Sequence, residues 1–340
     1  MRFFEQQERA RAQTVRLLLL FALTLLVLVV AVTAALALTW RLVAWQDAAY
    51  PAYFFHINTG MTLLFVLGGW WIESSNLGNG KVGSGEKLAR RAGARPAKVL
   101  GPLSRHGSLD AEQKFCNIVG ELAIAASMKA PTPMVLDRVD GINAFACGWN
   151  EDDAVVAVTQ GALDHLTREE LQGLVAHELS HIREGDMQLN MRLAGMVSGL
   201  EMIFNLGRTM CEADGKDSRS LLALPGFAIK WTGSFGWLAG RALKAAIARQ
   251  REYLADARAV QFTRSKDGLG GVLRKALGQV DVSRAMHPSV QHMLLLGTSS
   301  HERWLDTHPP IAERIRRIYG RSIGALSSDE VAPTRPDVIF

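Results

Sequence analysis

The stretch that most constrains this chain is residues 171–182, which read Leu-Gln-Gly-Leu-Val-Ala-His-Glu-Leu-Ser-His-Ile and contain the pattern H-E-x-x-H. The apolar residues recur at steps of three and four, the spacing that places side chains on one face of an α-helix. Thr167 precedes Glu170 by three positions, which is the capping-box pattern of a helix start. The sequence therefore predicts an amphipathic helix from which His177 and His181 project together.

Two imidazoles four residues apart on a helix can bind one zinc ion at about 2.0 to 2.1 Å. Such an ion lowers the pKa of water toward 7, and Glu178, next to the first histidine, is then a candidate general base. The alternative is a solvated helix that carries two histidines by chance. Because a catalytic zinc needs three protein ligands and an open fourth position, a third ligand decides between these explanations.

A second helical segment supplies candidates for that ligand. Residues 249–257 read Arg-Gln-Arg-Glu-Tyr-Leu-Ala-Asp-Ala, and Glu252 and Asp256 are four positions apart, hence on one helix face. Glu252 can bind the metal, and Asp256 can accept the N–H of a zinc-bound histidine and so fix its tautomer. Without the first motif, a charged helix face with local ion pairs is the simpler explanation.

Both motifs and a third one, Thr307-His308-Pro309-Pro310, together resemble the HtpX-like integral-membrane zinc metalloproteases, a gluzincin-type family related to the CAAX prenyl proteases. The resemblance runs from about residue 85 to residue 319. It implies one zinc ion per chain, held by three ligands: His177, His181 and Glu252. It also implies that Glu178 is the base, that Asp256 supports a histidine, and that His308 holds the substrate backbone or the developing oxyanion.

Three short apolar segments between turn-rich stretches read as strands: residues 134–136, 143–147 and 155–159. Helical patterns surround them, so we expect a mainly α fold with a small β-sheet, an α+β zincin-like metalloprotease domain. The segment Asn143-Ala144-Phe145-Ala146 resembles the family strand that borders the active-site cleft, where an edge strand binds an extended peptide. Asn143, Ala144 and Phe145 are therefore candidate substrate-binding residues. The alternative is an Asn in a turn and a Phe in the core.

The N-terminal part of the chain predicts a membrane anchor over residues 1–75. Residues 17–38 are apolar and uncharged, and as a helix they are long enough to cross a hydrocarbon core of roughly 30 Å. Residues 52–72 are a weaker second span, because His56 and Asn58 interrupt them. Lys and Arg cluster before the first span and after the second, which predicts a multi-pass cell-membrane protein with its catalytic domain facing the cytoplasm.

Composition divides the rest of the chain into three predicted parts: a linker rich in Gly, Asn and Ser over 76–85, a protease domain over 86–320 and a flexible tail over 321–340. Within the protease domain, the apolar stretches 193–206 and 221–240 separate the two motif helices. The family often has a second membrane hairpin here. Glu201 and Lys230 lie in these stretches, and charged side chains are energetically costly inside a membrane. Two amphipathic helices that lie on the membrane surface or cap the cleft are therefore an equal alternative.

Charge and cysteine content exclude other classes of protein. The net charge of +5 is modest and spread through the chain without aromatic interleaving, so we expect no nucleic-acid partner. The cysteines are odd in number and far apart, which suits a reducing compartment and leaves no C-x-x-C pair to compete for zinc. Arg314 either holds the substrate backbone or the developing oxyanion or, as the simpler expectation, pairs with Glu313 and the neighbouring helix.

Taken together, these features predict a membrane-bound zinc endopeptidase that hydrolyses peptide bonds and has the lipid bilayer as a partner. The HtpX resemblance implies damaged or misassembled membrane proteins as substrates, and hence a role in membrane-protein quality control. One alternative is a catalytically idle membrane scaffold or holdase with a structural zinc, against which the intact Glu178 argues. The other is a CAAX-type protease of prenylated peptides, against which the short intramembrane portion argues.

Overall fold

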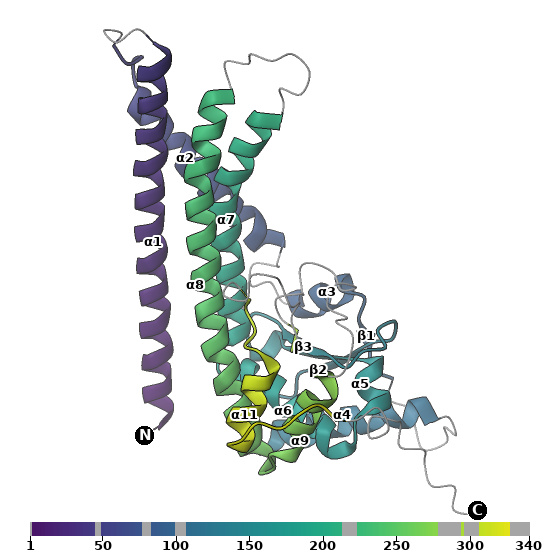
Figure 1. Ribbon diagram of the computed structural model, residues 1–340. Coiled ribbons are helices and arrows are strands. Elements are labelled where there is room, and N and C mark those ends of the chain that lie inside the picture. The colour runs from purple at the N-terminus through teal and green to yellow at the C-terminus, as the bar shows by residue number, and fades with distance from the viewer. Residues whose placement is uncertain are drawn as a thin grey trace, which may run out of the picture. The chain divides into compact units, whose positions relative to one another are not determined.

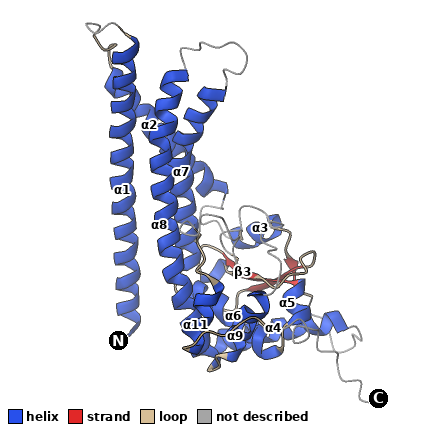
Figure 2. Ribbon diagram, viewed as in Figure 1, coloured by secondary structure: helices blue, strands red, loops and turns tan. Residues whose placement is uncertain are grey.

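The computed structural model describes residues 2–44, 49–76, 83–98, 107–212, 223–277, 294–295 and 306–326. The chain divides into two compact units: a helical unit of Met1–Asn76 and Met191–Lys244, and a sheet unit of Leu77–Asn190 and Ala245–Phe340. Helices dominate both units, and the described strands all belong to the sheet unit (Figures 1 and 2). This architecture confirms the predicted mainly α fold with a small sheet.

The helical unit contains α1 (Arg2–Val43), α2 (Phe54–Asn76) and the adjoining parts of α7 (Asp186–Glu212) and α8 (Ala223–Thr263). All four helices contribute to one apolar core, formed by Leu28, Val32, Val66, Leu200, Ile203 and Ile229. Among the described helices, only the stretch Leu19–Val43 of α1 is both long and apolar enough to cross a membrane. The second span of the anchor therefore stays a prediction.

Glycines bring these helices into close contact. A side chain at Gly199 of α7 would collide with the backbone carbonyl of Val66 in α2. A side chain at Gly233 of α8 would collide with the backbone of Phe204 in α7. Close approach of backbones at small residues is a common way for helices to associate in lipid, where apolar burial alone provides little driving force.

The sheet has four strands in the order β1-β2-β4-β3: β1 (Arg95–Pro96), β2 (Thr132–Leu136), β4 (Val155–Thr159) and β3 (Ala144–Cys147). β2 and β4 pair in parallel, and the other two pairs are antiparallel. The three predicted strands are confirmed. β1 was not predicted, because two residues that include a proline carry no alternating pattern.

Helices α3 (Ser84–Arg91), α4 (Gly107–Ala125), α5 (Gln160–His165), α6 (Arg168–Arg183), α9 (Asp267–Leu277) and α11 (Ile311–Tyr319) complete the sheet unit, with a 3₁₀ turn at Glu151–Asp153. The predicted capping box of α6 is present. The Thr167 hydroxyl accepts the N–H of Glu170 at 3.3 Å, and the Glu170 carboxylate accepts the N–H of Thr167 at 2.8 Å. Leu171, Val175 and Leu179 of α6 are buried in the main core, as their spacing predicts.

The structure joins segments that the sequence analysis treated separately. Residues 223–240 of the apolar stretch 221–240 and the Glu252 segment lie on one continuous helix, α8, and no proline lies between them. The predicted linker falls mainly on residues 77–82 and the predicted tail mainly on 327–340, and both ranges lie outside the described residues.

Two helical glycines of the sheet unit make a matched test of this packing. A side chain at Gly173 of α6 would collide with the backbone of Gly268 and Leu269 at the start of α9, whereas nothing lies within 4 Å of a Cβ at Gly120 of α4. An alanine in the middle of a helix normally stabilises it by about 0.5–1 kcal/mol relative to a glycine. We expect Gly120→Ala to raise the free energy of unfolding and Gly173→Ala to lower it by about 1–3 kcal/mol, measured by chemical unfolding in detergent. Stabilisation by both substitutions would contradict the packing described here.

Candidate metal centre

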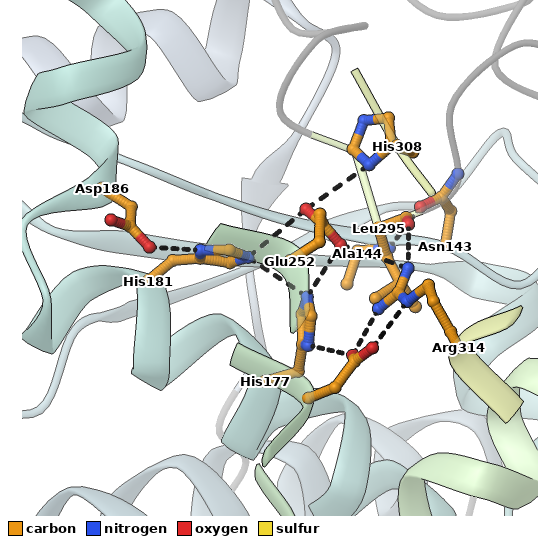
Figure 3. Close-up of polar contacts among 10 residues, drawn as sticks. Asn143, Ala144, His177, His181, Asp186, Glu252, Leu295, His308 and Arg314 are labelled. Atoms are coloured by element: carbon orange, nitrogen blue, oxygen red, sulfur yellow. Dashed lines mark hydrogen bonds and ion pairs between the residues drawn. The ribbon is translucent and has the colours of Figure 1, made fainter. Parts of the chain in front are cut away.

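Three predicted ligands converge in the sheet unit (Figure 3). The Nε2 atoms of His177 and His181, one turn apart on α6, lie 3.1 Å from each other. Glu252 of α8 directs one carboxylate oxygen to each ring, with 3.6 Å from Oε2 to His177 Nε2 and 3.6 Å from Oε1 to His181 Nε2. His177 and Glu252 are buried, and His181 is nearly so.

This set of donor atoms fits a metal ion. Ligand atoms about 2.0 to 2.1 Å from a tetrahedral zinc lie about 3.4 Å from one another. The observed separations of 3.1 and 3.6 Å lie on either side of that value. Among the described residues, His177, His181 and Glu252 are the one group of three His, Cys, Asp or Glu side chains whose ligand atoms all lie within 4.8 Å.

A carboxylate lies behind each imidazole. His177 Nδ1 is 3.1 Å from Asp256 Oδ1, and His181 Nδ1 is 2.9 Å from Asp186 Oδ2. When each Nδ1–H donates to its carboxylate, the lone pair of each Nε2 points toward Glu252. Asp256 therefore lies where the sequence placed it. Asp186 was not predicted as a site residue. In the sequence it is marked by its position directly after Gly185, which has a positive φ and follows the end of α6.

The electrostatic surroundings of the rings favour positive charge. Burial opposes the charged form of His177, but hydrogen bonds with Asp256 and Glu252 outweigh burial and raise its pKa to about 9. Burial likewise opposes ionisation of Glu252, yet the nearby charges of Arg314 and His308 hold the pKa of that carboxyl well below its usual range. The carboxylates around His177 thus favour positive charge at this position, whether a proton or a bound cation carries it.

Glu178 lies on α6 next to the first ligand and is 1 % exposed. Neither of its carboxylate oxygens has a hydrogen-bond partner among the described residues. Burial raises the pKa of this carboxyl, even though the two histidines beside it act in the opposite direction. A buried carboxylate with a raised pKa and no fixed partner is suited to accept and return a proton.

Arg314 corrects one expectation of the sequence analysis. Its fully buried guanidinium binds Asp256 through Nε at 2.9 Å and Nη2 at 2.7 Å, and its Nη1 lies 3.2 Å from Glu252 Oε2. The expected pairing with Glu313 is wrong, because adjacent residues of a helix point in different directions. The expected pairing with a neighbouring helix is present, since Asp256 and Glu252 lie on α8. Glu313 instead pairs with Arg316 and Arg317 on the exposed side of α11.

His308 approaches the centre from the residues that precede α11. Its Nδ1 lies 3.4 Å from Glu252 Oε1. In the described part of the chain, its Nε2 has no hydrogen-bond partner. The His308 ring therefore lies beside the Glu252 carboxylate, and its Nε2 can form a hydrogen bond with another group.

The predicted substrate-binding residues lie at the edge of the sheet, on β3 and just before it. Phe145 is fully buried, and the Asn143 side chain accepts the N–H of Ala144 at 2.9 Å. The Ala144 carbonyl accepts the N–H of Leu295 at 2.9 Å, so this main-chain position already has a partner. Since backbone groups alternate sides along a strand, Ala146 is the next residue whose N–H and C=O point to the same edge.

Comparison with known proteins agrees with this geometry. The family model described as Peptidase family M48 matches residues 110–322, which is more than half of the chain. A protease HtpX homolog of Ligilactobacillus salivarius is 34% identical over 215 residues, covering 59% of this chain and 71% of the relative. One from Dictyoglomus turgidum is 36% identical over 209 residues, covering 59% and 67%, and one from Streptococcus uberis is 31% identical over 225 residues, covering 63% and 75%. The chain therefore belongs to peptidase family M48, as an HtpX-like metalloprotease.

Proposed function

We propose that this protein is a zinc endopeptidase whose metal is held by His177, His181 and Glu252. The proposal rests on the convergence of these three donors next to the buried carboxylate of Glu178, which has no hydrogen-bond partner in the described part of the chain. Two imidazoles and one carboxylate form a donor set that zinc uses in catalytic sites with an open position. A structural zinc site has no use for a neighbouring free carboxylate, which argues against an idle scaffold.

When bound, zinc supplies a Lewis acid that polarises a peptide carbonyl and makes water more acidic. Glu178 takes a proton from the attacking water and delivers it to the leaving amine. His308 holds the substrate backbone or the developing oxyanion with its ring N–H, because one of its nitrogens has no partner among the described residues. The edge of β3, with Ala146 as its next main-chain position, binds the extended substrate by strand addition.

We further propose that the helical unit is a multi-pass membrane anchor and that the sheet unit faces the cytoplasm. Leu19–Val43 supplies one span. A second hairpin of α7 and α8 is supported by the glycine contacts of the helical unit. It is also supported by a row of aromatic side chains on α8 at four-residue spacing, Phe227, Trp231 and Phe235, each about 60 % exposed. Such an apolar face needs lipid or another helix to cover it.

Such an anchor would tether the active site to the bilayer, because both units belong to one chain. We therefore propose membrane proteins as substrates, including damaged or misassembled ones, in keeping with the resemblance to HtpX-like proteases. This places the enzyme in membrane-protein quality control. The alternative is a CAAX-type protease of prenylated peptides, against which the short intramembrane portion argues.

The substitution Glu178→Gln tests the catalytic proposal. It removes the base but leaves the three metal ligands, so we expect normal zinc content and a loss of roughly 100-fold or more in turnover of a casein or membrane-protein substrate. Glu169→Gln is the matched control, because Glu169 is an exposed residue of the same helix. Equal activity in the wild type and in Glu178→Gln would exclude Glu178 as the base. No activity in any form would favour the scaffold.

Cysteine labelling tests the topology. In a variant whose own Cys211 is replaced by serine, we expect Glu212→Cys at the end of α7 to react with a membrane-impermeant maleimide added outside intact cells. Lys129→Cys, an exposed position in the sheet unit, should react only after the membrane is opened. Protection of both positions in intact cells would mean that α7 and α8 lie on the cytoplasmic surface of the membrane.

A further inference from the structure

Asp186 is a buried carboxylate that no ligand motif of the sequence marks. It is 2 % exposed, and both of its oxygens face charged or ionisable groups. Oδ2 lies 2.9 Å from His181 Nδ1, and Oδ1 lies 3.0 Å from Nη1 of Arg251. In Figure 3, Asp186 lies on the side of the His181 ring opposite Glu252. The imidazole is therefore held between two carboxylates.

The same arrangement occurs at the other histidine. His177 Nδ1 faces Asp256, and Asp256 is held in turn by Arg314. Each imidazole thus has a carboxylate beside its Nδ1, and each of these carboxylates contacts a guanidinium. A carboxylate that accepts Nδ1–H keeps Nε2 unprotonated and fixes the plane of the ring, and a guanidinium keeps the carboxylate ionised and in place.

The position of Asp186 in the chain adds a second role. It is the first residue of α7, directly after the turn that ends α6, whereas Arg251 lies on α8 next to Glu252. The Asp186–Arg251 pair therefore connects the turn after α6 to α8, the helix that carries Glu252. In a neighbouring pair, Glu184 of the same turn lies 3.1 Å from Arg258 of α8.

We propose that Asp186, held by Arg251, is a positioning residue that orients His181 for metal binding and keeps α6 and α8 in register at the metal centre. The inference rests on the proposed zinc site. It assigns to Asp186 the task that Asp256 performs for His177. Glu184 offers a comparison within the same turn, because its ion pair is with Arg258 of α8, whereas Asp186 pairs with His181 as well as with Arg251.

The test compares zinc affinity in the full-length protein in detergent micelles, measured by competition with a fluorescent zinc chelator. We expect Asp186→Ala to weaken zinc binding roughly 10- to 100-fold. Asp186→Asn keeps an oxygen that can accept Nδ1–H, so it should fold like the wild type and lose less affinity than Asp186→Ala. Glu184→Gln, the matched control on the same turn, should stay within about twofold of the wild type. Cobalt added in place of zinc should give an altered visible spectrum in Asp186→Ala but not in Glu184→Gln.

The outcomes separate this inference from the proposed function. A wild type that binds no zinc would overturn both. Tight binding by the wild type, with Asp186→Ala and Asp186→Asn within twofold of it, would overturn the positioning role alone. An equal loss in Glu184→Gln and Asp186→Ala would also overturn it, because the effect would then belong to the turn and not to the imidazole.

Discussion

The meeting of α6 and α8 is the contact on which the rest of this structure depends. It buries two imidazoles and the carboxylates of Glu178, Glu252 and Asp256, together with the guanidinium of Arg314. Charges removed from water are costly unless they are paired and hydrogen-bonded, and a pair that loses one partner is strongly destabilised. Glu252, Asp256 and Arg314 each face a group of opposite charge or a ring nitrogen, whereas Glu178 has no hydrogen-bond partner among the described residues. The centre is therefore stable only when every element that contributes to it is in place.

This requirement explains the architecture around the centre. α11 brings Arg314 to the two carboxylates of α8, and the same guanidinium binds the carbonyl of Leu295 at 3.0 Å. Leu295 in turn donates to Ala144 at the edge of the sheet. The ligand carboxylate and the proposed substrate strand are thus connected through a single arginine. Their relative position is a property of the whole unit and not of one loop.

The parts of the site that rest on local pattern could be predicted from the sequence, and the parts that rest on distant contacts could not. The α6 helix, its capping box and the shared face of Glu252 and Asp256 follow from residues three and four apart. Asp186 and Arg314 obey no such spacing with their partners. Their contacts form only when α7, α8 and α11 are packed together. The predicted local pair of Arg314 with Glu313 was wrong, because Arg314 faces α8. The strand β1 was missed for a similar reason, since it is defined by its pairing with β2 and not by its own two residues.

X-ray absorption at the zinc edge of the purified, zinc-loaded protein tests whether His177, His181 and Glu252 hold the ion, because it reports the atoms around zinc. We expect nitrogen and oxygen ligands only, at about 2.0 to 2.1 Å, with the outer scattering of two imidazole rings. Replacement of Glu252 by glutamine should change the atoms bound to zinc while the imidazole signal persists. A sulfur ligand at about 2.3 Å, or a spectrum without two imidazoles, would show that other residues hold the ion.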